Sequence, residues 1–246
     1  MRSYLRKDKL LSILSTLLIV LSTSELCGQK PRIPSGGRVA VVVDERLSAL
    51  RAAPGLSARL VQRLSRGRFV AIVGAQRSAE GLTYYNVKVS RRRRGWLQAG
   101  AVVSLSQAAA DDGLLSLLRG SEDFDLIARA RIFLDAFPRS SLRPIVLRLY
   151  AEAAEEAATR LSRDASRRLN HNEMLAGGAP EFSYFMNFNG LDRYNRQGIR
   201  FTFDAGAKRF HYDGAAWREI LRRYPRSIEA SEARKRLQEL KAAIGR

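Results

Sequence analysis

Residue types that carry most enzyme chemistry are scarce in this sequence of 246 residues. The only histidines are His171 and His211, and the only cysteine is Cys27. A zinc site needs three or four ligands at characteristic spacings, and the two histidines are too far apart along the chain to form such a motif. The sequence also lacks a glycine-rich phosphate loop, a dinucleotide-binding fingerprint and a Gly-x-Ser-x-Gly elbow. It therefore predicts no metal, no cofactor and no nucleophilic catalytic residue.

Paired carboxylates are the remaining route to catalysis. Glu181, Asp192 and Asp204 lie in a segment rich in Phe and Tyr, where an apolar environment could raise a carboxyl pKa. Such a pair could cleave a glycosidic bond by acid and base catalysis. Solvation or helix capping explains each carboxylate more simply. A cell-wall hydrolase or modifying enzyme is therefore the alternative to a non-enzymatic protein.

Arginine is the residue type that offers the clearest binding chemistry. The chain has 43 basic and 24 acidic residues, and an uninterrupted run is formed by Arg91, Arg92, Arg93 and Arg94. Guanidinium groups on an exposed turn can pair with phosphates or carboxylates in a bidentate manner without a buried pocket. We interpret the run as an exposed turn that is either simply solvated or in contact with anionic envelope polymers. Sequence-specific nucleic-acid binding is not indicated, because no groove-fitting element accompanies the run.

The first 28 residues have the layout of a secretory signal, with a basic start, an apolar segment at 10–21 and small residues after it. The apolar segment is too short to cross about 30 Å of hydrocarbon comfortably as a helix. We expect an exported protein of the periplasm or cell envelope, cleaved after Ser24 or Gly28, that meets the membrane only through this segment. A retained anchor is the alternative. Lipidation of Cys27 is disfavoured, because the residues before it do not match the lipoprotein pattern.

Residues 38–105 follow a linker at 29–37 and have the short period of β-strands. β-branched runs occupy 39–43 and 69–73, and apolar residues alternate with polar ones at 84–89. Turn residues separate these segments at Pro54-Gly55, Gly67, Gly74 and Gly81. Short strands with close turns predict a small closed barrel, which leaves no exposed strand edge.

Four blocks of this segment carry a family resemblance: SALRAAPG (48–55), RLSRGRFVAIVG (63–74), YYNVKV (84–89) and GWLQAGAVV (95–103). In this order they resemble the bacterial SH3 domain. The resemblance implies an SH3-like barrel that contacts a cell-wall peptide or a protein partner, and it places Arg91–Arg94 at a turn between two strands. The candidate ligand contacts are Tyr84, Tyr85 and Trp96. We expect Trp96 to pack in the core, because it starts a strand directly after a glycine.

Residues 106–246 have the period of helices. Apolar residues recur every three or four positions over 126–137, with Ser121 placed as N-cap and Pro138 ending the helix. Three glutamates of the next helix are expected to face water, namely Glu152, Glu155 and Glu156.

Two nearly identical joints connect pairs of predicted helices. AFPRSSLR (136–143) and RYPRSIEA (223–230) both have an aromatic residue, then proline, then serine. These joints resemble the helix-turn-helix of tetratricopeptide-type envelope scaffold proteins. The landmark residues of that repeat are missing and the spacing does not match it, so we expect two related helical hairpins separated by an insertion rather than a tandem array.

The insertion, at about 171–212, belongs to a stretch (180–214) that holds nine of the eighteen Phe and Tyr residues of the chain. The alternation of its second half predicts a β-hairpin with one aromatic and one basic face. The hairpin is either a lid packed on the helices or a recognition surface where aromatics stack and arginines hold carboxylates. The candidate contacts of such a surface are Phe201, Phe203, Arg209 and Tyr212.

Together these patterns predict a multi-domain α+β protein: a small SH3-like β-barrel, then a helical, tetratricopeptide-like domain, each with its own hydrophobic core. The function that we expect is non-enzymatic binding or scaffolding in the bacterial cell envelope. A cell-wall enzyme is the first alternative. A basic nucleic-acid binder is the second, and it requires that the N-terminal segment is not a signal.

Overall fold

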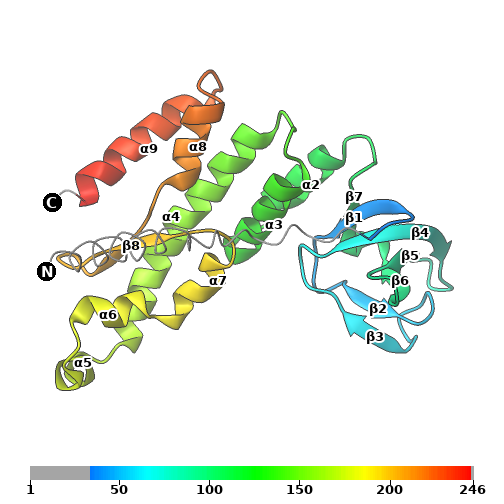
Figure 1. Cartoon of the computed structure of the whole chain (residues 1–246), viewed down its shortest axis with the longest axis horizontal. Helices are drawn as coiled ribbons and strands as arrows, with labels where there is room; N and C mark the ends of the chain where they lie inside the picture. The colour runs from blue at the N-terminus through cyan, green and yellow to red at the C-terminus, as the bar shows by residue number, and fades with distance from the viewer. Residues whose placement is uncertain (1–33, 245–246) are drawn as a thin grey trace, which may run out of the picture. The chain divides into compact units, whose positions relative to one another are not determined.

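A computed structural model of the protein describes residues 34–244 (Figure 1). Its strands are β1 (Arg38–Val42), β2 (Ala49–Arg51), β3 (Leu60–Arg63), β4 (Phe69–Arg77), β5 (Thr83–Lys88), β6 (Arg94–Gln98), β7 (Val102–Ser104), β8 (Phe201–Asp204) and β9 (Arg209–Tyr212). Its helices are η1 (Ala99–Ala101), α2 (Ala110–Arg119), α3 (Asp123–Ala136), α4 (Arg143–Arg168), α5 (His171–Gly177), α6 (Glu181–Met186), η2 (Asn189–Leu191), α7 (Asp192–Asn195), α8 (Ala215–Arg223) and α9 (Glu229–Ile244). The chain is therefore α+β, as the sequence predicts.

The expected secretory segment, its two cleavage positions, Cys27 and most of the linker at 29–37 lie outside the described residues. Between residues 34 and 244, no helix is both long and apolar enough to cross a membrane.

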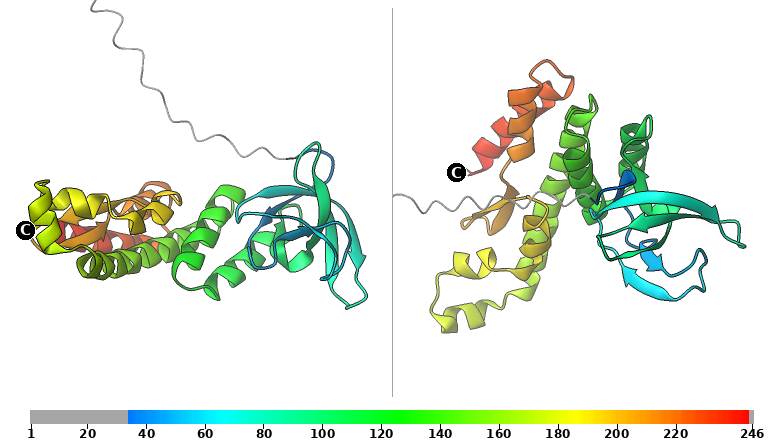
Figure 2. Two further views of the ribbon diagram at one scale, coloured as in Figure 1. Left: turned by 90° about the horizontal axis from the view of Figure 1, so that it is seen from below. Right: turned by 45° about the vertical axis from the view of Figure 1, so that its right-hand side comes forward.

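Strands β1 to β7 form one antiparallel sheet in the order β3-β2-β6-β5-β4-β1-β7. The strands predicted at 39–43, 69–73 and 84–89 are confirmed as β1, β4 and β5. Side chains from β1, β2, β4, β5, β6 and β7 meet in one apolar cluster, so the sheet curves around its own interior (Figure 2). The members of this cluster are Ala40, Val42, Leu50, Leu64, Val70, Ile72, Val87, Val89, Leu97, Ala101 and Val102.

Gly74 lies inside a strand, and the turn predicted there is wrong. Strand β4 continues to Arg77, and its pairing with β5 shifts register between Ile72 and Gly74. A glycine within a strand often marks such a bulge, because a residue without a side chain accommodates the local bend.

Gly95 of β6 lies close to the backbone of β2. A Cβ atom at this position would lie 2.7 Å from the Arg51 carbonyl oxygen and 2.9 Å from Leu50 Cγ. Because the backbone of β2 cannot move aside, we expect Gly95→Ala to lower the free energy of unfolding by about 1–3 kcal/mol in urea titrations. Gly113→Ala is the control: nothing lies within 4 Å of its added Cβ in α2, so it should stabilise by up to about 1 kcal/mol. Equal effects at both positions would contradict this account.

Helix α3 begins at Asp123 with Glu122 as its N-cap, so the prediction of Ser121 as N-cap is wrong. The Ser121 hydroxyl donates to the Leu117 carbonyl at 2.7 Å and accepts from Arg129 Nη1 at 2.6 Å. The buried Arg129 guanidinium needs hydrogen-bond acceptors, and the Ser121 hydroxyl is one of them. This hydroxyl therefore binds Arg129 instead of capping α3.

Both predicted helical joints are confirmed. Helix α3 ends at Ala136, before Pro138, and α8 ends at Arg223, before Pro225. At the first joint the Ser140 hydroxyl accepts from the Leu142 backbone N–H at 3.1 Å, just ahead of α4. Helices α3 and α4 therefore form one hairpin and α8 and α9 the other.

The predicted hairpin in the insertion is confirmed as β8 and β9, which pair in register from Phe201 opposite Tyr212 to Asp204 opposite Arg209. Its aromatic face is packed inward. Phe203 stacks on Phe185 of α6 with ring centroids 4.4 Å apart. The Phe210 N–H donates to Ser162 Oγ of α4 at 2.8 Å. The hairpin therefore packs its aromatic side chains on the helices, as the lid alternative predicts.

The hydrophobic core comprises two clusters that meet at β1. Ala40 and Val42 point into the interior of the sheet, whereas Val41 and Val43 join the larger cluster formed by the helices. Successive residues of a strand face opposite sides, so the apolar run of β1 is buried on both faces. The expected separation of the two cores is therefore incomplete.

Candidate functional site

The arginine turn lies between β5 and β6, and all four of its side chains are exposed: Arg91, Arg92, Arg93 and Arg94. The Ser90 N–H donates to the Arg93 carbonyl at 3.2 Å, and the Arg93 N–H donates back to the Ser90 carbonyl at 3.4 Å. These two bonds close the turn, so Arg91 and Arg92 are its two central residues. Arg94 begins strand β6. The exposed turn predicted at this position is therefore confirmed.

Within residues 34–244, the guanidinium groups of the arginine turn have no acidic partner. Arg93 Nη1 donates to Gln62 Oε1 of β3, which is a neutral acceptor. Neither Arg91 nor Arg92 donates a side-chain hydrogen bond to any of the residues 34–244. None of the four forms an ion pair within the same part of the chain.

The surroundings of the arginine turn add to its positive charge. Residues 34–105 contain thirteen basic and only three acidic side chains, namely Asp44, Glu45 and Glu80. Asp44 is bound by Arg46 and Arg129, and Glu45 accepts from the Arg66 N–H. A hydrogen bond from the Ser78 side chain holds the pKa of Glu80 below its usual value. The sheet therefore presents a strongly positive surface.

Trp96 faces outward beside this charge, so the expectation that it packs in the core is wrong. Leu97 is fully buried in the interior of the sheet, and alternation along β6 turns Trp96 to the other face. Trp96 is half-buried and lies directly opposite Asn86 of β5, whose Oδ1 atom is buried without a hydrogen-bond partner in the described chain. Two residues along, Arg94 lies opposite Lys88.

These four residues define the outer face of the β5–β6 hairpin: Asn86, Lys88, Arg94 and Trp96. Residues that are opposite in an antiparallel pair share a face, as do residues two apart in one strand. The face thus places an aromatic ring and an amide beside two cations, at the end of the hairpin that carries the arginine turn.

The other two aromatics predicted as ligand contacts, both tyrosines, lie differently. Tyr84 is 1% exposed and its hydroxyl has no hydrogen-bond partner among residues 34–244, so no ligand can reach it in this structure. Tyr85 is half-buried and packs against the interior cluster of the sheet. Of the three aromatics predicted from the family resemblance, Trp96 is the most suitably placed for a ligand.

The aromatic recognition surface predicted in the insertion is wrong for Phe201 and Tyr212, which are 7% and 3% exposed. The Tyr212 hydroxyl accepts from the Ala216 N–H at 2.7 Å, inside the helical core. Phe203 is half-buried against Phe185, and only Arg209 of the four predicted contacts is exposed. The apolar face is buried because α4 and α6 cover it.

Two of the three carboxylates considered for catalysis have structural contacts. Glu181 Oε1 forms an ion pair with Lys208 Nζ at 2.6 Å. Asp204 Oδ1 accepts from the N–H groups of Gly206 and Ala207 and so stabilises the turn between β8 and β9. Asp192 is exposed at the start of α7. Within residues 34–244, no group of three or more His, Cys, Asp or Glu side chains is arranged to hold a metal ion.

No family model, curated protein or solved structure matches the chain.

Glu155 is a chemically distinctive residue that the sequence pattern assigned to water. It is half-buried instead, as is Glu152, and only Glu156 of the three glutamates is exposed. The Glu155 Oε1 atom accepts from Trp217 Nε1 at 2.7 Å. Burial raises the pKa of the Glu155 carboxyl, although the Trp217 hydrogen bond opposes this shift. The alanine content of α4 could have indicated that Glu155 is partly buried. A helix that is apolar on several sides is covered by other elements on several sides, so few of its positions face water.

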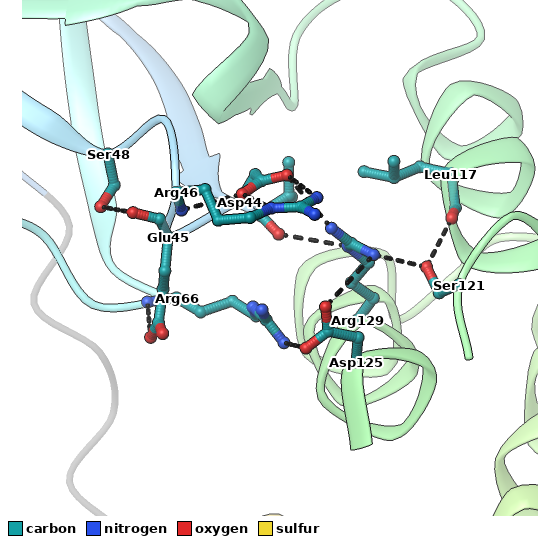
Figure 3. Close-up of polar contacts among 10 residues, drawn as sticks. Asp44, Glu45, Arg46, Ser48, Arg66, Leu117, Ser121, Asp125 and Arg129 are labelled. Carbon is teal, nitrogen blue, oxygen red and sulfur yellow. Dashed lines mark hydrogen bonds and ion pairs between the residues drawn. The ribbon is translucent and has the colours of Figure 1, made fainter. Parts of the chain in front are cut away.

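A buried polar cluster joins the sheet to the helices (Figure 3). Arg129 of α3 is 3% exposed and donates to Asp44 Oδ2 at 3.3 Å, to the Val43 carbonyl at 3.3 Å and to Ser121. Beside it, Arg66 Nη1 donates to Asp125 Oδ1 at 2.8 Å. The cluster anchors the end of β1 to α3, and every polar group of Arg129 that faces it has a partner.

Proposed function

We propose that this protein is an exported, non-enzymatic binding or scaffold protein of the bacterial cell envelope, and that its sheet holds an anionic envelope polymer. One observation carries the proposal: four exposed guanidinium groups on a single turn have no ion-pair partner in the described chain. The outer face of the β5–β6 hairpin continues this surface with Lys88 and Trp96. Export rests on the layout of the first 28 residues.

We also propose the finer architecture. The curvature of the sheet around one apolar cluster supports an SH3-like barrel at 38–105. The two hairpins with aromatic-Pro-x-Ser joints support a tetratricopeptide-like scaffold at 106–246. An SH3-like barrel would bind a cell-wall peptide or a protein partner, and Trp96 and Tyr85 are the aromatics left within reach of one.

The composition of the outer face favours a polymer that carries both sugars and acidic groups. Arginine pairs with phosphates and carboxylates through parallel hydrogen bonds, and these contacts weaken as salt screens the charges. An aromatic ring packs on the apolar side of a sugar, and this contact depends little on salt. The two contributions can therefore be separated by varying the ionic strength.

The test measures binding of the full chain to immobilised lipopolysaccharide and teichoic acid across a salt series. Replacing Arg91–Arg94 by glutamine should make the slope of log affinity against log salt less negative by about 3, because up to four polymer contacts are lost. Trp96→Ala should weaken binding about tenfold at every salt concentration, because stacking is not screened. The matched control removes the same charge from four exposed arginines outside the sheet that form no ion pair within residues 34–244. Arg119 and Arg222 lie in helices α2 and α8, and Arg139 and Arg226 lie in the turns of the two helical joints.

Equal loss of binding in the two quadruple variants would mean general attraction to a positive protein and would contradict a site at the arginine turn. Tighter binding to double-stranded DNA than to either polymer would favour the nucleic-acid alternative. Release of soluble fragments from peptidoglycan that is lost in Glu181→Gln would favour the enzyme.

A further inference from the structure

A cleft of about 490 Å³ lies between α4, β9 and α9, far along the chain from the arginine turn. One face of α4 forms its floor through residues three and four positions apart. Strand β9 and helix α9 form its walls. The polar side chains that line the cleft include Glu155, Arg163, Arg209, His211 and Arg236.

One end of the cleft has an acceptor without a hydrogen-bond donor in the described chain. Glu155 Oε1 accepts from Trp217, but Oε2 accepts no hydrogen bond from residues 34–244, and its nearest cation, Arg236 Nη1, is 3.8 Å away. Arg236 is also engaged by Glu232 at 2.7 Å and Glu239 at 3.6 Å. A half-buried carboxylate oxygen that accepts no hydrogen bond and has only a long ion pair attracts an N–H donor, and most strongly a charged one.

The other end has unused donors. Arg163 and Arg209 line the cleft and are exposed, and neither side chain has a hydrogen bond or ion pair with the described residues. Ser162 is next to Arg163 in α4, and Phe210 is next to Arg209 in β9. The Phe210 N–H donates to Ser162 Oγ, and this hydrogen bond holds the two elements together beside the arginines. Two guanidinium groups held on adjoining elements form a site for a carboxylate.

The two ends have a defined separation. Eight residues separate Glu155 from Arg163 along α4, which corresponds to about 12 Å of helix rise. An extended tripeptide spans about 10 Å, so its amino and carboxyl ends reach both groups with the help of the side chains. His211 Nε2, which is buried without a partner in the described chain, lines the same cleft and can bond to the peptide main chain.

We propose that this cleft binds a short peptide by its two free ends: the ammonium group contacts Glu155 Oε2, and the carboxylate contacts Arg163 and Arg209. The rest of the lining includes Ala158, Phe210, Leu240 and Ala243, which suits small apolar side chains. The inference goes beyond the proposed function, because it concerns a different surface and a different class of ligand.

The experiment is calorimetric titration of the full chain with trialanine, N-acetyl-trialanine and trialanine amide. Trialanine should bind, and blocking either end should weaken binding at least tenfold, because each block removes one charged contact. In Glu155→Gln, which keeps an acceptor for Trp217, trialanine and its N-acetyl form should bind alike. In Arg163→Gln/Arg209→Gln, trialanine and its amide should bind alike. Arg119→Gln/Arg139→Gln is the control for charge and should match the unmodified protein.

Absence of binding at millimolar trialanine would overturn the proposal, as would equal affinity for the three peptides. The peptide comparison on the unmodified chain needs no variant, so a variant that fails to fold does not obscure the result. Loss of polymer binding on substitution of the arginine turn has no bearing on this cleft, and the two proposals therefore fail independently.

Discussion

Replacing Asp44 by asparagine is expected to lower the free energy of unfolding by about 3 kcal/mol, because it removes the closest counter-ion of a buried charge. The charge belongs to Arg129, which is 3% exposed and whose remaining carboxylate neighbour is Asp125 at 4.0 Å. Asparagine keeps the volume of the side chain, so the loss reports on charge rather than on a cavity. Urea titration followed by circular dichroism measures it.

A double variant separates this effect from simple loss of contacts. Asp44→Asn/Arg129→Met removes both charges, so it should be more stable than Asp44→Asn alone, although it contains one more substitution. Arg46→Ala removes the other partner of Asp44. The Arg46 side chain is 74% exposed, so water can take its place, and this variant should lower the free energy of unfolding far less than Asp44→Asn. A double variant less stable than the single one would refute the buried-charge explanation.

Acid should reproduce the effect of the Asp44 substitution. The hydrogen bond from the Arg46 side chain, with smaller contributions from Arg129, holds the pKa of Asp44 below its ordinary value of 3.8. The unfolded chain then binds the proton more readily, so the stabilisation by Asp44 is complete above 3.8 and is lost as the pH falls through the lowered folded-state pKa. The stability difference between the unmodified protein and Asp44→Asn should therefore shrink on acidification.

The local elements of the fold could be predicted from the sequence because they depend on period and turn residues. Strands β1, β4 and β5, the two helical joints and the β8–β9 hairpin all follow from residues close together in the chain. What covers each face was not predictable in the same way. The sequence places Val41 and Val43 in a strand, but it does not say what covers their side chains. Only the folded chain packs α3 and the neighbouring helices against them.

The same distinction explains the candidate sites. The exposure of Arg91–Arg94 follows from their place in a hairpin turn, which is a local property. The burial of Tyr84, Phe201 and Tyr212 depends on elements distant in the sequence, and an aromatic residue alone does not reveal whether it binds or packs. The alternation of side chains along β6 could have predicted the orientation of Trp96. If Leu97 points into the interior of the sheet, its neighbour Trp96 must point outward.

Replacing Trp217 by alanine is expected to lower the free energy of unfolding by about 3–5 kcal/mol, because a large aromatic side chain is removed from the core. Trp217 has no exposed surface and is the largest fully buried side chain among residues 34–244. Its loss would open a cavity between α8 and α4 and leave Glu155 Oε1 without its donor. Thermal and urea unfolding of the full chain measure the loss, and a change below about 1 kcal/mol would contradict the observed packing.

Trp217→Phe separates the hydrogen bond from the packing. Phenylalanine fills most of the volume but cannot donate to Glu155, so the expected loss is about 2 kcal/mol at neutral pH. Burial already raises the pKa of Glu155 above its ordinary value of 4.5, and loss of the N–H donor should raise it further. A carboxyl whose pKa is raised in the folded state destabilises the fold once it ionises, so the cost of Trp217→Phe should grow as the pH rises above 4.5 and through the raised folded-state pKa of Glu155. A cost independent of pH would show that Trp217 contributes through packing alone.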